Sequence, residues 1–318
     1  MDNIINSNNF SPSPAGWQHQ WSPAAVLCIR GEDALGFLQG QFSQDLQPRT
    51  IASQVCYGLW LNHKGRVLAD SFTLVAGSDE VWLVSYLSVA AGIREWLESH
   101  VVADDVTIED QTAAWRGLAL AGPHAPAWLS SVAAGGPPPS GQFVRMAGGF
   151  VFRGRRSAGE SWECLAPAAS PPPACAVLPE ISAATLELMR LADRLPAVPA
   201  DLGPGDLPHE AGLETTAVSY TKGCYVGQEV MARLRTGKIR RRLVRVSGPG
   251  PAPARLVPLF QQDKKIGGLR SAAADGHGGF LGLAMLTLLG LDPAAPLALA
   301  PGAPAEIRTL DHPARTTP

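Results

Sequence analysis

The sequence predicts an α+β fold divided among two or three domains. Its 318 residues exceed what one simple hydrophobic core usually organises. Between residues 24 and 112, strand-like runs that are joined by turns alternate with short amphipathic helices. From Arg242 onward the composition changes to short strands separated by Gly and Pro, which predicts a small β-barrel or sandwich over residues 242–318.

Residues 1–20 are polar and rich in Asn, Ser and Pro, so we expect a disordered tail without the basic and apolar regions of a signal peptide. The first α+β unit is predicted over residues 21–112. It begins with a strand at residues 24–30. A short helix follows, because Leu35, Leu38 and Phe42 recur at spacings of three and four residues.

A β-hairpin comes next in the first unit. Its strands are predicted over residues 55–61 and 67–75, on either side of a turn in which Gly65 supplies positive φ. A third strand is expected at residues 81–86. The pattern of residues 88–98 predicts a helix, which completes an antiparallel sheet with helices beside it.

A second α+β unit is predicted over residues 113–178, with strands at residues 115–120 and 142–153. Residues 179–241 are expected to complete the α+β core. They contain a helix over residues 178–195 and then a Pro- and Gly-rich loop over residues 197–212. A loop of that length within a compact region is more often functional than idle.

The bulk composition excludes several classes of protein. Lys plus Arg total 26 and Asp plus Glu total 28, so a net charge of −2 gives no global attraction to nucleic acid or membrane. No apolar run reaches the length of a membrane span. The five cysteines are scattered and none forms Cys-x-x-Cys, and no pair of histidines has metal-ligand spacing. We therefore expect a cytoplasmic protein with no metal site of its own.

The segment Lys222-Gly223-Cys224-Tyr225-Val226-Gly227-Gln228-Glu229 carries the strongest chemical signal. Its glycines allow the backbone to approach a ligand closely, and the ammonium of Lys222 favours the thiolate of Cys224. Two interpretations are open from the residues alone. Cys224 is either a reactive thiol or a small buried hydrophobe in a glycine turn.

Two further features also leave alternatives open. The basic residues that follow the octapeptide predict either a solvated strand and helix end or a site for a polyglutamate tail, phosphate or RNA. A weak RNA contact would involve Lys238, Arg240, Arg241 and Arg242, but no aromatic residues for base stacking are interleaved. Asp70, on the second hairpin strand, either accepts a hydrogen bond from a heterocyclic N–H or faces solvent.

The octapeptide, together with Arg233, resembles the signature of the YgfZ family of folate-binding proteins. Residues 37–45, 64–70 and 207–210 resemble other segments of that family, so the resemblance extends from about residue 24 to the C-terminal barrel. The family is similar in fold to the T-protein of the glycine cleavage system, an aminomethyltransferase. The resemblance implies three domains around a central hole in which tetrahydrofolate or a derivative binds.

The resemblance also implies a function. It is that of a folate-binding accessory factor for the assembly or repair of iron–sulfur proteins, which indirectly supports tRNA modification. Its partners would be iron–sulfur client proteins or the assembly machinery. Cys224 and Lys222 would be the working pair, and classical turnover is not required. The residues expected to contact folate are Asp70, Tyr225, Gly227, Gln228, Glu229 and Arg233.

The alternative is a tetrahydrofolate-dependent aminomethyltransferase, a folate-dependent one-carbon transferase like the T-protein. The T-protein holds the pterin with a Glu in an Arg-Leu-Glu-Ala-Gly-like run. This sequence has Ala192 at the Glu position and Arg194 at the Gly position. Asp193 is the residue that we expect to substitute for the missing carboxylate.

Overall fold

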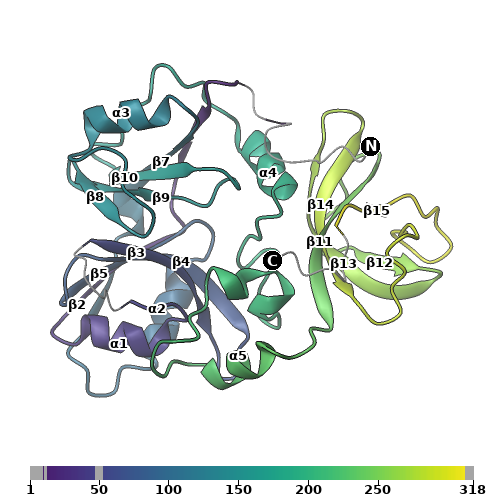
Figure 1. Ribbon diagram of the computed structural model, residues 1–318, viewed down its shortest axis with the longest axis horizontal. Coiled ribbons are helices and arrows are strands. Elements are labelled where there is room, and N and C mark those ends of the chain that lie inside the picture. The colour runs from purple at the N-terminus through teal and green to yellow at the C-terminus, as the bar shows by residue number, and fades with distance from the viewer. Residues whose placement is uncertain (1–9, 11–12, 47–52, 312–318) are drawn as a thin grey trace.

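Three five-stranded antiparallel sheets organise the chain in the computed structural model (Figure 1). The structure describes residues 10, 13–46 and 53–311. Most of the expected N-terminal tail and the last seven residues of the expected barrel, 312–318, therefore lie outside the described residues. In the described part of the chain, no helix is both long and apolar enough to span a bilayer.

The first sheet has the predicted hairpin at one edge and is covered on both faces. Its order is β3 (Gln54–Leu61), β4 (Val67–Val75), β5 (Glu80–Ser85), β2 (Ala25–Arg30) and β6 (Thr107–Asp110). Helices α1 (Ala34–Gln41) and α2 (Ala90–Glu98) cover one face, where Leu27 and Ile29 of β2 are buried. Val26 and Cys28 alternate with them and face the second sheet, as the period of two in a strand requires.

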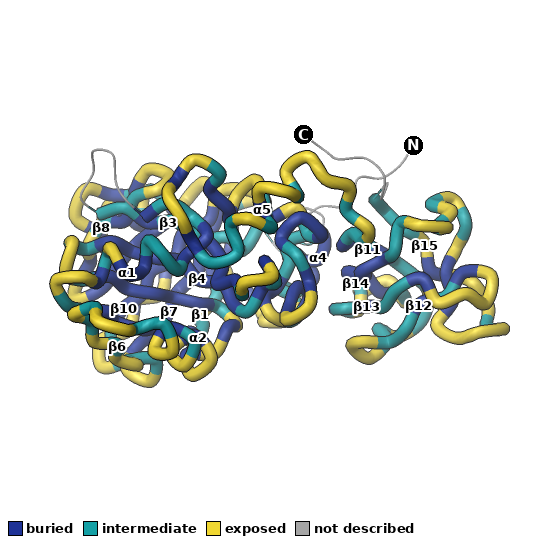
Figure 2. The backbone as a smooth tube through the Cα atoms, turned by 90° about the horizontal axis from the view of Figure 1, so that it is seen from below, coloured by how far each residue is buried: buried dark blue, intermediate teal, exposed yellow. Residues whose placement is uncertain are grey.

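The second sheet meets the first through an aromatic layer. Its order is β1 (Trp17–Trp21), β7 (Trp115–Ala121), β10 (Ser161–Pro167), β9 (Gly149–Arg153) and β8 (Phe143–Met146). Phe150 and Phe152 of β9 pack against Phe72 and Trp82 of the first sheet. The short helix α3 (Ala125–Val132) covers the opposite face. Figure 2 shows buried backbone along the adjacent strands of these two sheets, with exposed residues on the outer turns.

Three predictions for this region were wrong in detail. Residues 17–20, expected in the tail, belong to β1, which pairs with β7 along its whole length. The strand expected over residues 142–153 is the hairpin β8–β9, which turns at Gly148 with a φ of 75°. The helix expected over residues 178–195 is shorter. In α4 (Ala183–Ala192), the Ser182 side chain accepts a hydrogen bond from the Thr185 N–H and so caps the start.

The third sheet forms the predicted C-terminal β unit. Its order is β12 (Pro258–Gln261), β13 (Lys264–Ala274), β14 (Gly279–Thr287), β11 (Arg241–Pro249) and β15 (Arg308–Thr309). Isolated bridges join Phe260 to Ala298 and Leu297 to Ile307, so the sheet curls into a half-barrel. Its inner face has a hydrophobic cluster of its own.

The segment between α4 and β11 holds these parts together. Apart from η3 (Pro208–Glu210), η4 (Leu213–Thr215) and α5 (Gln228–Leu234), this segment is irregular, as its Pro and Gly content predicts. One hydrophobic cluster joins it to the first sheet, to α4 and to the third sheet, and it includes Leu61, Leu191, Tyr225, Met231 and Leu283. The signature is therefore built into the junction of the fold (Figure 1).

Candidate functional site

A cavity of about 220 Å³ lies where the first sheet, the β9–β10 connection and α4 meet. We call it the Asp70 cavity. Its volume is below the roughly 300–1,000 Å³ typical of sites that hold a complete drug-sized ligand. The residues that line it are His19, Tyr57, Asp70, Tyr86, Leu87, Arg155, Arg156, Ala183, Leu186, Glu187, Arg190, Leu195, Pro196, Ala197 and Val198.

Asp70 is a buried carboxylate held by three hydroxyl groups. Tyr57 Oη donates to Asp70 Oδ2 at 2.8 Å, while Ser88 Oγ and Ser85 Oγ donate to Oδ1 at 2.7 and 3.0 Å. Burial raises the pKa of Asp70, against the opposing effect of these hydrogen bonds and of the Arg155 charge. The structure thus excludes the solvent-facing alternative for Asp70 and fixes its carboxylate in a cavity wall.

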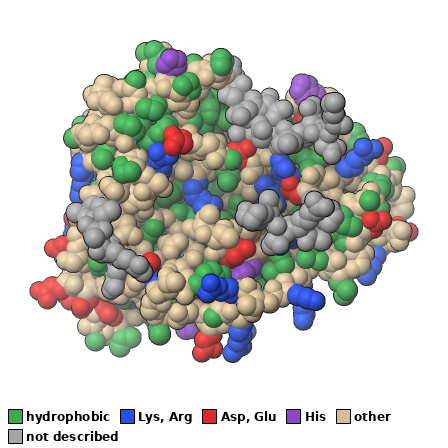
Figure 3. Space-filling model, in the orientation of Figure 1, with side chains coloured by type: hydrophobic (Ala, Val, Ile, Leu, Met, Phe, Trp, Pro, Cys, Tyr) green, Lys and Arg blue, Asp and Glu red, His purple; other side chains and the backbone are tan. Residues whose placement is uncertain are grey.

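Arginines form much of the opposite wall. The Arg155 guanidinium lies 3.9 Å from the centroid of the Tyr57 ring, and that of Arg156 lies 3.7 Å from the centroid of Tyr86. Such contacts fix the planes of the guanidinium groups. Figure 3 shows Lys and Arg side chains near the middle of this face of the molecule. A flat ligand with a negative charge would match this wall.

Two buried carboxylates keep the arginine wall in place. Glu163 is fully buried on β10, and its Oε1 accepts hydrogen bonds from Tyr86 Oη at 2.7 Å and Arg156 Nε at 3.2 Å. Arg190 of α4 donates to Asp201 Oδ2 at 2.6 Å, and Asp201 is also fully buried. Because these partners come from different parts of the fold, the cavity is assembled only when the sheets and α4 pack together.

The Asp70 cavity adjoins a second, outer cavity of about 400 Å³. Tyr57 and Arg155 line both, and Arg155 Nη1 also donates to Thr216 Oγ1 at 3.2 Å. The outer cavity is further lined by Gln54 and Cys56. The two spaces together would accept a ring in the inner cavity and a polar extension past Arg155.

Lys222 of the signature is buried and faces the end of α1 rather than solvent. Its Nζ donates to the carbonyl oxygens of Gln39, Phe42 and Gln44 at 2.6, 2.7 and 3.0 Å. The last carbonyls of a helix have no partner within it, so the ammonium supplies what this helix end lacks. Burial lowers the pKa of Lys222 to about 8.

A second thiol, that of Cys56, lies within reach of the Lys222 charge. Burial raises the pKa of Cys56 to about 12, and the Lys222 charge opposes that rise. Three carbonyls hold the Lys222 ammonium at α1, and no hydrogen bond among the described residues joins it to Cys224. Cys224 itself is exposed and free, which excludes the interpretation that it is a buried hydrophobe.

The residues on either side of Cys224 fix the turn that presents it. Tyr225 is buried in the junction cluster and its Oη donates to the Ser219 carbonyl at 3.3 Å. Gly227 has a φ of 86°, and a Cβ there would lie 2.9 Å from the Asn62 carbonyl oxygen. Gly227 therefore has to be glycine, because α5 begins against the turn of the β3–β4 hairpin.

The structure does not gather the expected folate residues at one place. The Asp70 cavity is lined by none of the other five, which are Tyr225, Gly227, Gln228, Glu229 and Arg233. Glu229 and Arg233 are exposed on α5, where they form an ion pair at 3.7 Å. Asp70 and the signature are thus two separate features, the first in the body of the β3–β4 hairpin and the second packed against its tip.

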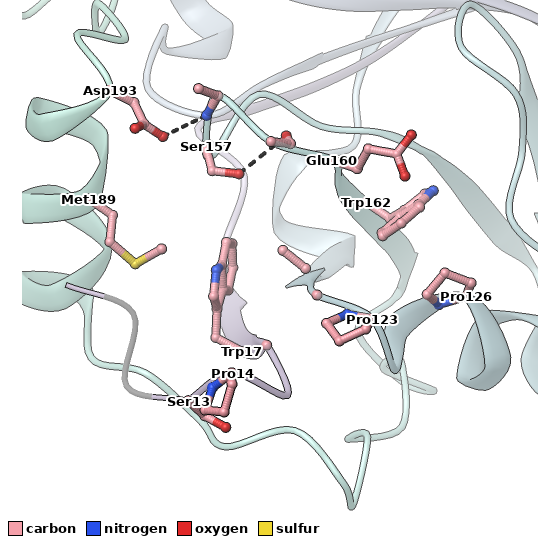
Figure 4. Close-up of a pocket in the computed structure, with 15 residues that line it drawn as sticks. Ser13, Pro14, Trp17, Pro123, Pro126, Ser157, Glu160, Trp162, Met189 and Asp193 are labelled. Atoms are coloured by element: carbon pink, nitrogen blue, oxygen red, sulfur yellow. Dashed lines mark hydrogen bonds between the residues drawn. The ribbon is translucent and has the colours of Figure 1, made fainter. Parts of the chain in front are cut away.

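Asp193, the expected substitute for the missing Glu, lies in a different cavity of about 740 Å³ (Figure 4). Its Oδ2 accepts a hydrogen bond from the Ala158 N–H at 2.6 Å. The carboxylate of α4 that does line the Asp70 cavity is Glu187, which forms a two-point contact with Arg190 at 2.7 and 2.8 Å. No local signal in the sequence marked Glu187, Arg155 or Arg156.

The basic segment after the signature divides into two parts. Arg241 is a structural residue, since it donates to Glu210 at 2.7 and 2.9 Å and lies 3.1 Å from Asp206. Arg240 and Lys238 are exposed. Among the described residues, no group of three or more His, Cys, Asp or Glu side chains is placed to hold a metal ion.

The chain is similar to several known proteins. Residues 21–140 match the GCVT N-terminal domain family. The mitochondrial iron–sulfur cluster assembly factor IBA57 of Mus musculus is 30% identical over 288 residues, which cover 82% of this chain and 75% of that protein. An aminomethyltransferase of Nostoc sp. is 23% identical over 274 residues, covering 76% of this chain and 69% of the relative.

One solved structure carries the comparison of folds. The glycine cleavage system aminomethyltransferase T from Bartonella henselae matches with a TM-score of 0.74. The match covers 92% of this chain and 84% of that one, at 17% sequence identity. The two proteins therefore share a fold.

Proposed function

Since the chain belongs to the YgfZ family, which includes the iron–sulfur cluster assembly factor IBA57, we propose that it is a folate-binding accessory factor for the assembly or repair of iron–sulfur proteins. The observation that carries the proposal is the 30% identity to IBA57 over 82% of this chain. Two structural features support it. They are the exposed thiol of Cys224 and the buried carboxylate in the Asp70 cavity.

The residues of the Asp70 cavity fit the ring system of a reduced folate. Asp70 and Glu187 offer carboxylate oxygens to the N–H groups of a heterocycle, and the tyrosine-backed arginines offer flat walls. The inner cavity has room for a fused ring system but not for the whole cofactor. Arg155 would then meet the acidic tail in the outer cavity. When bound, tetrahydrofolate would carry a one-carbon unit.

Cys224 is the residue that we assign to the client protein or assembly machinery. It is exposed on a turn fixed by Tyr225 and Gly227, so a partner can reach it without any rearrangement of the core. Lys222 is assigned a positioning role, since its ammonium holds α1 against the segment that carries the thiol.

The proposal includes finer points that rest on the family resemblance. They are a division into units at residues 21–112, 113–178, 179–241 and 242–318 around a central folate site, and indirect support of tRNA modification. The strand β1 belongs with the second unit, because it pairs with β7. A cytoplasmic location is also part of the proposal and is supported by five cysteines that are all free.

A complementation experiment tests the function. A strain that lacks the gene is supplied with the wild type, Cys224→Ala or Asp70→Asn, and the activities of several iron–sulfur enzymes are measured under oxidative stress. We expect wild type to restore them, Cys224→Ala to fail, and Asp70→Asn to fail in proportion to its loss of reduced-folate binding in vitro. Normal iron–sulfur enzyme activities in the strain without the gene would refute the proposal.

The second candidate is a tetrahydrofolate-dependent aminomethyltransferase, favoured by the shared fold. Against it, Ala192 is buried and Asp193 lies in the other cavity, so the pterin carboxylate of the T-protein pattern has no counterpart at its expected position. Turnover with an aminomethyl-lipoyl carrier and tetrahydrofolate that survives Cys224→Ala would favour this candidate.

A further inference from the structure

Five exposed cationic side chains lie on two segments that meet next to the turn that presents Cys224. Four come from α5 and the residues after it, and the fifth comes from the tip of the β3–β4 hairpin. We call this surface the basic face. Its members are Lys64, Arg233, Arg235, Lys238 and Arg240, all exposed.

The fold, and not the sequence order, brings the two parts of the basic face together. Gly65 at the hairpin tip packs against α5, because a Cβ on Gly65 would lie 2.9 Å from Val230 and 2.8 Å from Met231. A Cβ on Gly227 would lie 3.2 Å from Gly65 Cα. Figure 3 shows basic side chains at the lower edge of the molecule, where α5 lies in Figure 1.

The charge of the basic face is nearly unopposed. Within residues 62–66 and 223–240, Glu229 is the single carboxylate. Its pair with Arg233 at 3.7 Å joins side chains that are 89% and 79% exposed, a geometry in which solvent screens most of the attraction. Arg241, by contrast, is already neutralised by Glu210 and Asp206. The local excess of positive charge stands out on a chain whose net charge is −2.

The exposed thiol of Cys224 lies beside the basic face. Cys224 precedes the start of α5 by four residues, and Arg233 follows that start by five. The chain from Cys224 to Gly227 spans at most about 11 Å. Gly227 in turn lies against Gly65, the neighbour of Lys64. This separation is of the order of the Debye length of about 8 Å at physiological ionic strength, so the cation at the hairpin tip acts on whatever approaches the thiol.

We propose that the basic face docks an acidic surface of a partner protein and thereby delivers that partner to the Cys224 thiol. This inference rests on the proposed function for the use of the thiol and adds the chemistry of the partner. A protein is favoured over RNA because, within the two segments, the Tyr225 ring is buried and His63 alone presents an exposed ring on which a base could stack. The Tyr220 ring nearby is covered by the Arg235 guanidinium at 5.3 Å. Single-stranded RNA is ordinarily held by exposed rings on which bases stack.

Thiol–disulfide exchange at Cys224 provides the test. The probes are two short peptides, one rich in Asp and one with Asn in the same positions, each linked through its own cysteine to thionitrobenzoate. The Cys224 thiolate attacks the peptide sulfur, a new disulfide forms, and the thionitrobenzoate thiolate leaves and absorbs light. Cys224→Ser gives the background from the other cysteines, of which Cys28, Cys164 and Cys175 are buried.

We expect the acidic peptide to react about tenfold faster than the neutral one at low salt, at the lower end of electrostatic steering effects. The advantage should disappear in about 1 M salt, where the Debye length falls to about 3 Å. It should also disappear in a variant with Arg233→Glu, Arg235→Glu and Lys238→Glu. A matched control with Lys265→Glu and Arg308→Glu, two exposed cations of the third sheet, should retain it.

Equal rates for the two peptides in the wild type would overturn the proposal, as would an advantage that survives charge reversal. Tighter binding of a ten-nucleotide single-stranded RNA than of the acidic peptide would assign the face to RNA and overturn it too. Neither folate nor an iron–sulfur enzyme enters these measurements. A failure here is therefore distinct from a failure of the complementation experiment.

Discussion

Lys222→Met separates the structural role of the signature lysine from the chemical role of the signature cysteine. Methionine has a similar length but has no N–H to donate. The substitution removes the three hydrogen bonds to the carbonyls of Gln39, Phe42 and Gln44 and leaves those oxygens without the donor that α1 relies on. At about 1 kcal/mol of net stability for each bond, the free energy of unfolding should fall by about 3 kcal/mol.

Urea unfolding followed by tryptophan fluorescence measures this effect, with Cys224→Ala as the matched control. Cys224 is exposed and makes no described packing contact in the core, so its substitution should change stability by no more than about 0.5 kcal/mol. Amide hydrogen exchange adds a local readout. Protection should be lost first in α1 and in residues 43–44 of Lys222→Met, while Cys224→Ala exchanges like the wild type.

The opposite pattern would refute the reasoning. If Lys222→Met unfolds at the wild-type urea concentration and yet loses iron–sulfur activity to the same degree as Cys224→Ala, then Lys222 acts on the chemistry of the thiol. The three carbonyl contacts would in that case be incidental.

Three other perturbations follow from the same structure. Gly227→Ala should cost at least about 1 kcal/mol of stability in urea unfolding, since φ is 86° and a Cβ would meet the Asn62 carbonyl at 2.9 Å. Gly223→Ala is the control, because a Cβ there meets nothing within 4 Å, and it should be nearly neutral. Arg241→Ala should destabilise by about 3 kcal/mol because it removes the cationic partner of the buried Glu210, whereas Asp206 keeps Arg270 at 3.1 Å. Lys238 is exposed, so Lys238→Ala should change the midpoint little. Burial lowers the pKa of His209 below its ordinary value of 6.5, so its contribution to stability is present above pH 6.5 and is lost as the pH falls toward the lowered value. Unfolding measured between pH 7.5 and 5 should show this loss in the wild type and a flatter profile in His209→Gln, and an unchanged slope in that variant would contradict the assignment.

The local elements could be predicted where one short pattern decides them. The β3–β4 hairpin was predicted within one residue, because Gly65 stands between two apolar runs and has positive φ in the structure. Strand β1 was missed although Trp17 and Trp21 have the spacing of one strand face, since the polar composition of the residues before it dominated the interpretation. Its partner, β7, lies about a hundred residues further on, and that pairing leaves no local trace.

The site could be predicted only in part, for the same physical reason. Cys224 and Asp70 are visible as single residues in recognisable surroundings. What each of them faces is decided by long-range packing. Lys222 meets α1 across 183 residues of sequence, and Asp70 meets Arg155 only when two sheets pack together. A sequence neighbour such as Lys222 therefore does not by itself fix the environment of Cys224.

The separation of Asp70 from the signature changes how the two features are expected to cooperate. They lie on one hairpin, with the Asp70 cavity near the middle of β4 and the signature packed on the hairpin tip through Gly65 and Gly227. A ligand that fills the cavity contacts Tyr57 and Asp70, which face each other across that hairpin. Because α5 packs against the hairpin tip, a ligand in the cavity can change the position of the turn that carries Cys224 without touching the thiol. Such coupling requires that the hairpin be rigid. A reduced folate should therefore change the rate at which Cys224 is alkylated in the wild type. The same folate should leave that rate unchanged in Asp70→Asn.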